Sequence, residues 1–158
     1  MRVSVIGAGR VDEGTAAVAE ELGRLLGGRG HTLVCGGRGG VMRAACRGAR
    51  GSGAETVGIL PSADPAEANE YVTVPVATGL GHARNALVPL NGDAVVAVTG
   101  GPGTLSEIGF ALVYGRPVAG LATHEIDGIE ACDSPAAAVE YVEHAVDTGA
   151  VEGAGGGD

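Results

Sequence analysis

The feature that most constrains the fold is a glycine-rich segment between an apolar run and a helical pattern. Residues 94–98 form a continuous Ala/Val run, which is typical of a strand buried on both faces of a parallel sheet. The glycine-rich segment Thr99 to Glu107 follows, and residues 108–114 predict a helix. At such a strand-to-helix turn, unpaired N–H groups and the helix dipole can bind a phosphate. The candidate phosphate ligands are Gly100, Gly101, Gly103 and Thr104.

A purely structural explanation of the same segment stays open. A Gly-Gly pair is a common tight turn in α/β domains. Thr104 and Glu107 also fit a capping box, with Thr104 as the N-cap and Glu107 at position N3. A chemical role for Glu107 therefore competes with a capping role.

A second glycine-rich turn follows the apolar strand predicted at residues 31–35. Its candidate ligand-binding residues are Gly36, Gly37, Gly39, Gly40 and Met42, and an Ala-rich helix then extends to about residue 50. Two such turns in one short domain favour a shared anionic ligand. The alternative is that these glycines only allow close packing of helix on sheet. Arg38 lies in the turn itself and is the arginine best placed to meet a ligand.

Strand and helix patterns alternate along the rest of the chain. Further strands are predicted at residues 2–6, 56–60, 71–74 and 118–122, and the strand at 71–74 should be short and lie at or near a sheet edge. Helices are predicted at residues 13–26 and 78–90. A last helix should begin after Ser134, with Ser134 as its N-cap and Pro135 at position N1. This order predicts a three-layer, Rossmann-like α/β domain with a doubly wound, mostly parallel sheet over residues 1–150. Both glycine turns should lie at the carboxyl edge of the sheet, where such folds bind ligands. Residues 151–158 form a glycine-rich tail that we expect to be disordered.

Composition and motifs disfavour several functions. The net charge is −9 and all ten basic residues are Arg, so the chain is a poor candidate for nucleic-acid binding. Asp12 stands where a dinucleotide fingerprint needs its third glycine, which disfavours a dinucleotide site after the first strand. His124, Glu125 and Asp127 are expected in a solvated loop, and no metal site is predicted.

The three cysteines also indicate a compartment. Cys35, Cys46 and Cys132 form no Cys-x-x-Cys motif and are expected to be reduced and buried. The sequence has neither a signal-peptide pattern nor an apolar segment of membrane-spanning length, so we expect a cytoplasmic protein without a membrane partner.

Two motifs together resemble those of the LOG-like superfamily, long mislabelled "lysine decarboxylase". The turn from Gly36 to Met42 is similar to its first glycine motif, and Gly100 to Glu107 is similar to its second. Arg84 stands at about the place of the family's active-site arginine. The resemblance implies phosphoribohydrolase activity, in which a nucleoside 5′-monophosphate is cleaved to free base and ribose 5-phosphate. Glu107 and Arg84 would be the catalytic residues, and no cofactor is predicted.

Two departures resemble a different branch of the superfamily. Thr99 replaces the family's proline, and Asn85 stands where LOG enzymes usually have Lys. In these features the chain is similar to small molybdenum-cofactor carriers, which implies binding of a phosphorylated pterin without turnover. Either resemblance implies a homo-oligomer, a dimer or a tetramer. Lysine decarboxylation is excluded because the chain has no lysine to form a Schiff base.

Overall fold

The computed structural model describes residues 1–150; the predicted tail at 151–158 lies outside the described residues. Its centre is a seven-stranded parallel sheet in the order β4-β3-β2-β1-β5-β6-β7. The strands are β1 (Arg2–Gly7), β2 (Thr32–Cys35), β3 (Thr56–Leu60), β4 (Val74–Ala77), β5 (Ala94–Val98), β6 (Val118–Leu121) and β7 (Ile129–Ala131). The predicted doubly wound, Rossmann-like fold is confirmed.

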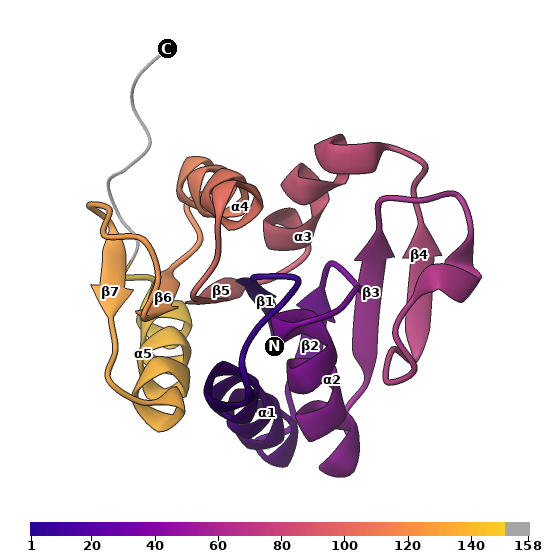
Figure 1. Ribbon diagram of the computed structural model, residues 1–158. Coiled ribbons are helices and arrows are strands. Elements are labelled where there is room, and N and C mark those ends of the chain that lie inside the picture. Colours follow the sequence, from indigo (N-terminus) through magenta and orange to yellow (C-terminus); the bar gives the residue numbers. More distant parts are fainter. Residues whose placement is uncertain (151–158) are drawn as a thin grey trace.

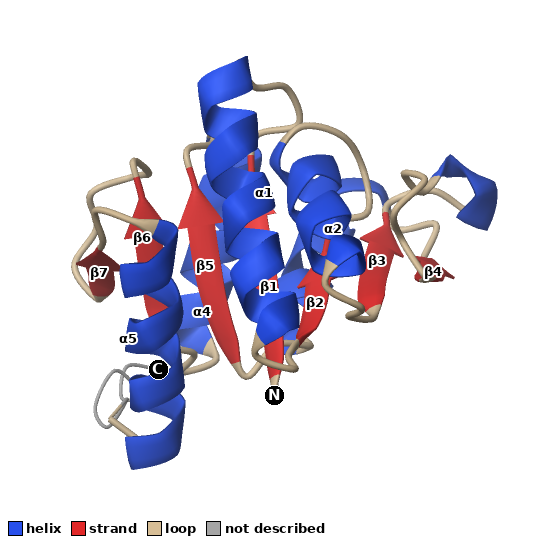
Figure 2. Cartoon of the chain, turned by 90° about the horizontal axis from the view of Figure 1, so that it is seen from below, coloured by secondary structure: helices blue, strands red, loops and turns tan. Residues whose placement is uncertain are grey.

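Helices cover both faces of the sheet (Figures 1 and 2). They are α1 (Glu13–Gly28), α2 (Val41–Gly51), α3 (Leu87–Leu90), α4 (Pro102–Val113) and α5 (Pro135–Thr148), with short 3₁₀ helices η1 (Pro65–Glu67) and η2 (Gly81–Ala86). In Figure 1, α1, α2 and α5 lie below the sheet and α3 and α4 above it. Each face buries its own apolar cluster, one around Leu22 and Leu26 and the other around Val88 and Ile108.

The strand order reverses between β1 and β5. The chain adds β2, β3 and β4 on one side of β1 and then returns, so that β5 pairs with the other side; Val3 is in register with both Leu33 and Ala94. At such a reversal the loops that follow the two central strands diverge over opposite faces and leave a crevice at the carboxyl edge. The glycine turns after β2 and β5 both end at this edge.

Several predicted elements differ from the structure. The strand predicted at 71–74 is β4 at 74–77, and it is an edge strand as expected. The helix predicted at 78–90 is η2 followed by the short α3, because Gly79 and Gly81 have positive φ and Pro89 removes an N–H donor. Strand β7 was not predicted, since three residues carry too short a pattern. Cys132 is only partly buried, whereas Cys35 and Cys46 are buried as expected.

The capping box predicted for Thr104 and Glu107 is wrong. Helix α4 begins at Pro102 and its N-cap is Gly101, which makes no side-chain cap. Proline suits the first helical position because its fixed φ is already helical and no N–H is lost there. Thr104 and Glu107 therefore lie inside the helix, and both are buried. At the last helix, by contrast, the predicted N-cap Ser134 with Pro135 at N1 is confirmed.

Candidate functional site

The helices that start at the carboxyl edge differ in whether a side chain accepts a hydrogen bond from the free N–H groups of the first turn. Asp12 caps α1 by accepting from the N–H of Thr15 at 2.7 Å, and Ser134 caps α5 by accepting from the N–H of Ala137 at 3.2 Å. Helices α2 and α4 instead have glycine N-caps, Gly40 and Gly101, without a side-chain cap. The two glycine motifs of the sequence thus coincide with the two of these helices that have no side-chain cap. At α2 the N–H of Val41 already donates to the carbonyl of Ala8 at 2.9 Å, so the first turn of α4 is the better candidate for an anion.

In α4 the open N–H groups are those of Gly103 and Thr104. Neither has a hydrogen-bond partner among residues 1–150, because the first bond of the helix is donated by Leu105 to the carbonyl of Gly101. An added Cβ at Gly101 would meet nothing within 4 Å, and one at Gly103 would meet only Asn85 Nδ2, at 3.8 Å. This first turn is therefore accessible to a ligand.

Arg84 and Glu107 form a buried pair beside this turn. Arg84 lies on η2 and is 8% exposed; Glu107 lies on α4 and is 6% exposed. The Arg84 Nη1 to Glu107 Oε1 distance is 3.7 Å, and Nη1 also donates to Asn85 Oδ1 at 3.0 Å. The Nε of Arg84 is buried and has no partner among the described residues. A buried guanidinium with unused donors is suited to bind an anion.

Burial changes the ionisation of both members of the pair. It raises the pKa of Glu107 to about 8, although Arg84 pulls that pKa in the opposite direction. Burial also lowers the pKa of Arg84, and Glu107 partly offsets this effect. Because arginine stays protonated in proteins, the pair carries net positive charge near neutral pH. Glu107 is then largely a neutral carboxyl group.

The first glycine motif contacts this pair through Gly36 and Met42. An added Cβ at Gly36 would lie 2.6 Å from Arg84 Nη1 and 2.8 Å from Met42 Sδ. Gly36 therefore leaves the space that the guanidinium of Arg84 occupies. The structure brings together Gly36, Met42, Arg84 and Glu107 from three separate parts of the chain.

The remaining predicted glycines have identifiable structural roles. Gly37 and Gly40 have positive φ (75° and 60°), and Gly37 packs against Gly58 while Gly40 packs against the loop after β1. Gly39 lies near the carbonyl of Gly9 in the same loop, and Gly100, with φ 111°, packs against the side chain of Thr104. These contacts explain the glycines without a ligand, and ligand contact at them stays a prediction.

Two polar residues that the sequence analysis did not assign to the site connect η2 to α4. Asn85 donates from Nδ2 to Ser106 Oγ at 3.2 Å, and Ser106 donates to the carbonyl of Gly103 at 2.6 Å. With the bond from Arg84 to Asn85, this chain holds Arg84 beside the first turn of α4. The only available signal was the position of Asn85 directly after Arg84.

The loop from Thr123 to Gly128 is hydrogen-bonded to the turn at residues 99–101, which we call the central turn. It lies on the side of this turn away from Arg84. Thr123 Oγ1 donates to the carbonyl of Thr99 at 2.7 Å, and His124 Nε2 is hydrogen-bonded to the carbonyl of Gly101 at 3.2 Å. His124 is thus half-buried against the turn, while Glu125 and Asp127 are exposed as expected. Within residues 1–150, no group of three His, Cys, Asp or Glu side chains could hold a metal ion. No helix in that range has the length and apolar character needed to cross a membrane.

Comparison with known proteins identifies a family and a relative that match most of the chain. The family model described as the SLOG cluster4 family matches residues 1–148. An uncharacterized protein of Archaeoglobus fulgidus is 42% identical over 142 residues, which are 89% of this chain and 93% of that protein.

Two solved structures are similar over nearly their whole length. The molybdenum cofactor binding protein of Rippkaea orientalis aligns with a TM-score of 0.86 and 32% identity, covering 92% of this chain and 96% of that one. The molybdenum cofactor carrier protein of Chlamydomonas reinhardtii aligns with a TM-score of 0.85 and 32% identity, covering 92% and 98%.

Proposed function

The chain belongs to the SLOG cluster4 family, and from this premise we propose that it binds a phosphorylated pterin of the molybdenum-cofactor type and carries it without turnover. The phosphate would bind at the first turn of α4, to the N–H groups of Gly103 and Thr104 and to the guanidinium of Arg84. The pterin identity is supported by the similarity to the two molybdenum-cofactor proteins.

The observation that carries the proposal is the state of Arg84. Its side chain is buried, its Nε is unpartnered among the described residues, and its Nη1 lies 3.7 Å from the largely neutral carboxyl group of Glu107. Burying a charge with so few partners is costly unless another group compensates it. A phosphate at the adjacent open turn of α4 would supply the missing acceptors.

The proposal is tested by phosphate-dependent binding. Titration of the purified protein with a pterin phosphomonoester should give tighter binding than the same pterin without phosphate, by at least about tenfold. Arg84→Gln should remove that difference, whereas Arg50→Gln, on the exposed end of α2, should keep it. Equal affinity for the two pterins in the unmodified protein would refute a phosphate site at Arg84.

A second candidate function is hydrolysis of nucleoside 5′-monophosphates, and the proximity of Arg84 and Glu107 favours it. In this case ionised Glu107 would stabilise positive charge at the anomeric carbon while the bound phosphate positions the ribose. The raised pKa of Glu107, about 8, weakens this candidate because a neutral carboxyl supplies no such charge.

Chromatography of reactions with a panel of nucleoside monophosphates separates the two functions. Release of free base and ribose 5-phosphate that rises with pH and is lost in Glu107→Gln would establish the hydrolase. Binding without release would support the carrier.

A further inference from the structure

A cavity of about 950 Å³ lies on the side of the central turn opposite to Arg84. It opens at the carboxyl ends of β5, β6 and β7, between the first turns of α1 and α5. Val98, Leu121 and Ile129 supply apolar surface, and Thr15 and Val18 of α1 form one wall. Neither Arg84 nor Glu107 lines it, but Thr99 does, so the cavity and the phosphate site share one turn of chain.

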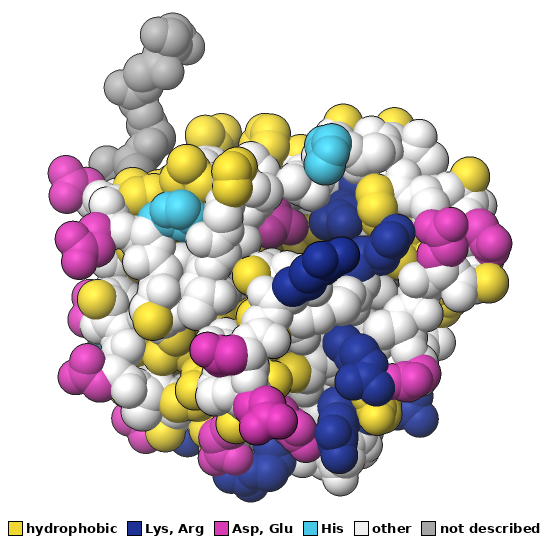
Figure 3. Space-filling view, in the orientation of Figure 1, with side chains coloured by type: hydrophobic (Ala, Val, Ile, Leu, Met, Phe, Trp, Pro, Cys, Tyr) yellow, Lys and Arg dark blue, Asp and Glu magenta, His cyan; other side chains and the backbone are white. Residues whose placement is uncertain are grey.

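The charge around this cavity is opposite to that around Arg84. The residues that line it include Glu125, Asp127 and Asp133 and no arginine. The two helices that start beside it are the capped ones, α1 and α5, whose first turns already use Asp12 and Ser134. Figure 3 shows magenta carboxylates at the left edge of this face, near β7, and dark-blue arginine side chains right of its centre, with further carboxylates at the right edge. The cavity therefore disfavours phosphate and suits a group that donates hydrogen bonds.

The backbone at the cavity wall is strained in two places. Thr99 and Ala122 both line the cavity and both have a φ of 49°, a left-handed conformation that costs on the order of 1 kcal/mol for a residue with a Cβ. Thr123 and His124 hold this conformation through their bonds to the carbonyls of Thr99 and Gly101. The Oγ1 of Thr99 is buried without a partner in the described part of the chain. Strain that the surrounding bonds maintain commonly marks a binding site.

We propose that this cavity is a second subsite, which binds a fused two-ring heterocycle through its amino and ring N–H donors. The proposal rests on the function above and extends it: the phosphate lies at the first turn of α4, and the heterocycle lies across the Thr99–Gly101 turn. Apolar walls with a few polar groups at the rim match the usual form of such sites. The carboxylates of Asp127 and its neighbours accept from the donors.

The test uses the whole protein and three probes: a pterin without phosphate, guanine, and inorganic phosphate. Thr15→Trp places a large side chain on the cavity wall, and Ala17→Trp makes the same change on α1 outside it. Thr15→Trp should weaken binding of the heterocycle at least about tenfold and leave phosphate affinity within about twofold. Ala17→Trp should change neither. The pterin and guanine titrations identify which heterocycle the site prefers.

A second variant, Asp127→Asn, tests the same subsite independently of any folding defect that Thr15→Trp causes. Asp127→Asn removes one rim charge and should weaken heterocycle binding several-fold, whereas Asp147→Asn, exposed on α5, should not. Heterocycle binding that survives both Thr15→Trp and Asp127→Asn overturns the subsite.

Failure of the two proposals can be distinguished. If a phosphorylated pterin binds through Arg84 and neither cavity variant weakens it, only the subsite is refuted. If phosphate does not bind but Thr15→Trp weakens free pterin, the phosphate site is refuted and the subsite is supported.

Discussion

At the scale of single residues, the chemistry of the site depends on one buried carboxyl group. Glu107 has a pKa of about 8 because burial outweighs the attraction of Arg84. The protonated form leaves the positive charge of Arg84 available to a phosphate. Ligand binding and the protonation of Glu107 are thus coupled through a 3.7 Å contact.

The first prediction concerns stability against pH. The folded-state pKa of Glu107 is raised from 4.5 to about 8, so the native state binds more protons in this range and its free energy of unfolding falls as the pH rises. The slope from this group is at most about 1.4 kcal/mol per pH unit. Glu107→Gln should remove it, so the variant should match the unmodified protein near pH 4.5 and be the more stable above pH 8.

Urea denaturation across this pH range measures the difference. Glu55→Gln, an exposed carboxylate before β3, serves as the control and should run parallel to the unmodified protein. Parallel profiles for Glu107→Gln as well would show that Glu107 titrates normally.

The second prediction concerns Gly36. A methyl group there would lie 2.6 Å from Arg84 Nη1 and would displace the guanidinium. The contacting atoms end flexible side chains, so the loss of stability in Gly36→Ala should stay within the range of about 1–3 kcal/mol that is usual for overpacking. It should weaken binding of inorganic phosphate about tenfold, as calorimetry can measure. Gly9→Ala, whose Cβ would meet nothing within 4 Å, is the matched control. Unchanged phosphate affinity in Gly36→Ala would place the phosphate elsewhere.

At the scale of elements, glycines allow the close contact of α1 with α2. An added Cβ at Gly23 would collide with the carbonyl of Ala45, and one at Gly48 would collide with the carbonyl of Glu20. Both obstacles are backbone and cannot move without shifting a helix. The close contact therefore depends on glycine at both positions.

The third prediction uses two glycines of α2. Gly48→Ala should destabilise the protein by about 1–3 kcal/mol through overpacking. Gly51→Ala, at the end of the same helix with open space around it, should be neutral or stabilising by up to about 0.5 kcal/mol. Thermal and urea denaturation of both variants test this. A small effect at Gly48 would mean that the two helices separate easily.

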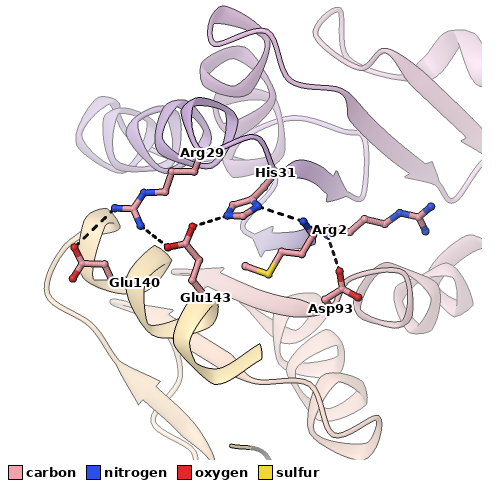
Figure 4. A network of polar contacts seen from close by, with 7 residues as sticks. Arg2, Arg29, His31, Asp93, Glu140 and Glu143 are labelled. Carbon is pink, nitrogen blue, oxygen red and sulfur yellow. Dashed lines mark hydrogen bonds and ion pairs between the residues drawn. The ribbon is translucent and has the colours of Figure 1, made fainter. Parts of the chain in front are cut away.

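At the scale of the whole molecule, a polar network joins α5 to the start of the chain at the edge of the sheet opposite to the site (Figure 4). Glu143 accepts from Arg29 Nη1 and is bonded to His31 Nε2, both at 2.6 Å. Burial raises the pKa of Glu143, but the bonds from His31 and Arg29 outweigh it and lower the pKa overall.

The fourth prediction follows from this network. Glu143→Gln should cost on the order of 1 kcal/mol at neutral pH. Because a lowered pKa stabilises the native state only while the group is ionised, the difference should shrink as the pH falls through 4.5 and below. Glu140→Gln should have almost no effect, since Glu140 is 69% exposed and its ion pair with Arg29 spans 3.9 Å. Chemical denaturation at neutral and acidic pH tests this, and equal losses for both variants would contradict it.

The fifth prediction concerns self-association. Helix α4 exposes Leu105, Phe110 and Val113, and its one charged residue, Glu107, is buried. Exposed apolar patches often mark protein–protein contacts, and the resemblance to oligomeric proteins leads us to expect a second copy of the chain here. Val113→Arg, at a position 77% exposed, should lower the mass measured by analytical ultracentrifugation without lowering monomer stability. An unchanged mass would exclude this face.

The sequence by itself determined the architecture, because continuous apolar runs, glycine turns and alternating patterns are local signals. The strand at 94–98, the cap at Ser134 and the doubly wound sheet all followed from such signals. Local patterns also located the two glycine turns, and resemblance to a family singled out Arg84 and Glu107 as candidate site residues. The doubly wound topology alone predicts that the two glycine turns lie at the carboxyl edge of the sheet.

Only the tertiary structure decided what those residues do to one another. The burial that neutralises Glu107, the space that Gly36 leaves for Arg84, and the bonds through Asn85 and Ser106 join parts of the chain that are distant in sequence. Helix α4 begins at Pro102, so Thr104 lies inside the helix and cannot be its N-cap. The sequence did not decide between the two starts, because proline is as favourable at the first helical position as threonine is at the N-cap. Burial and contact are properties of neighbours in space, so a local pattern of residues does not contain them.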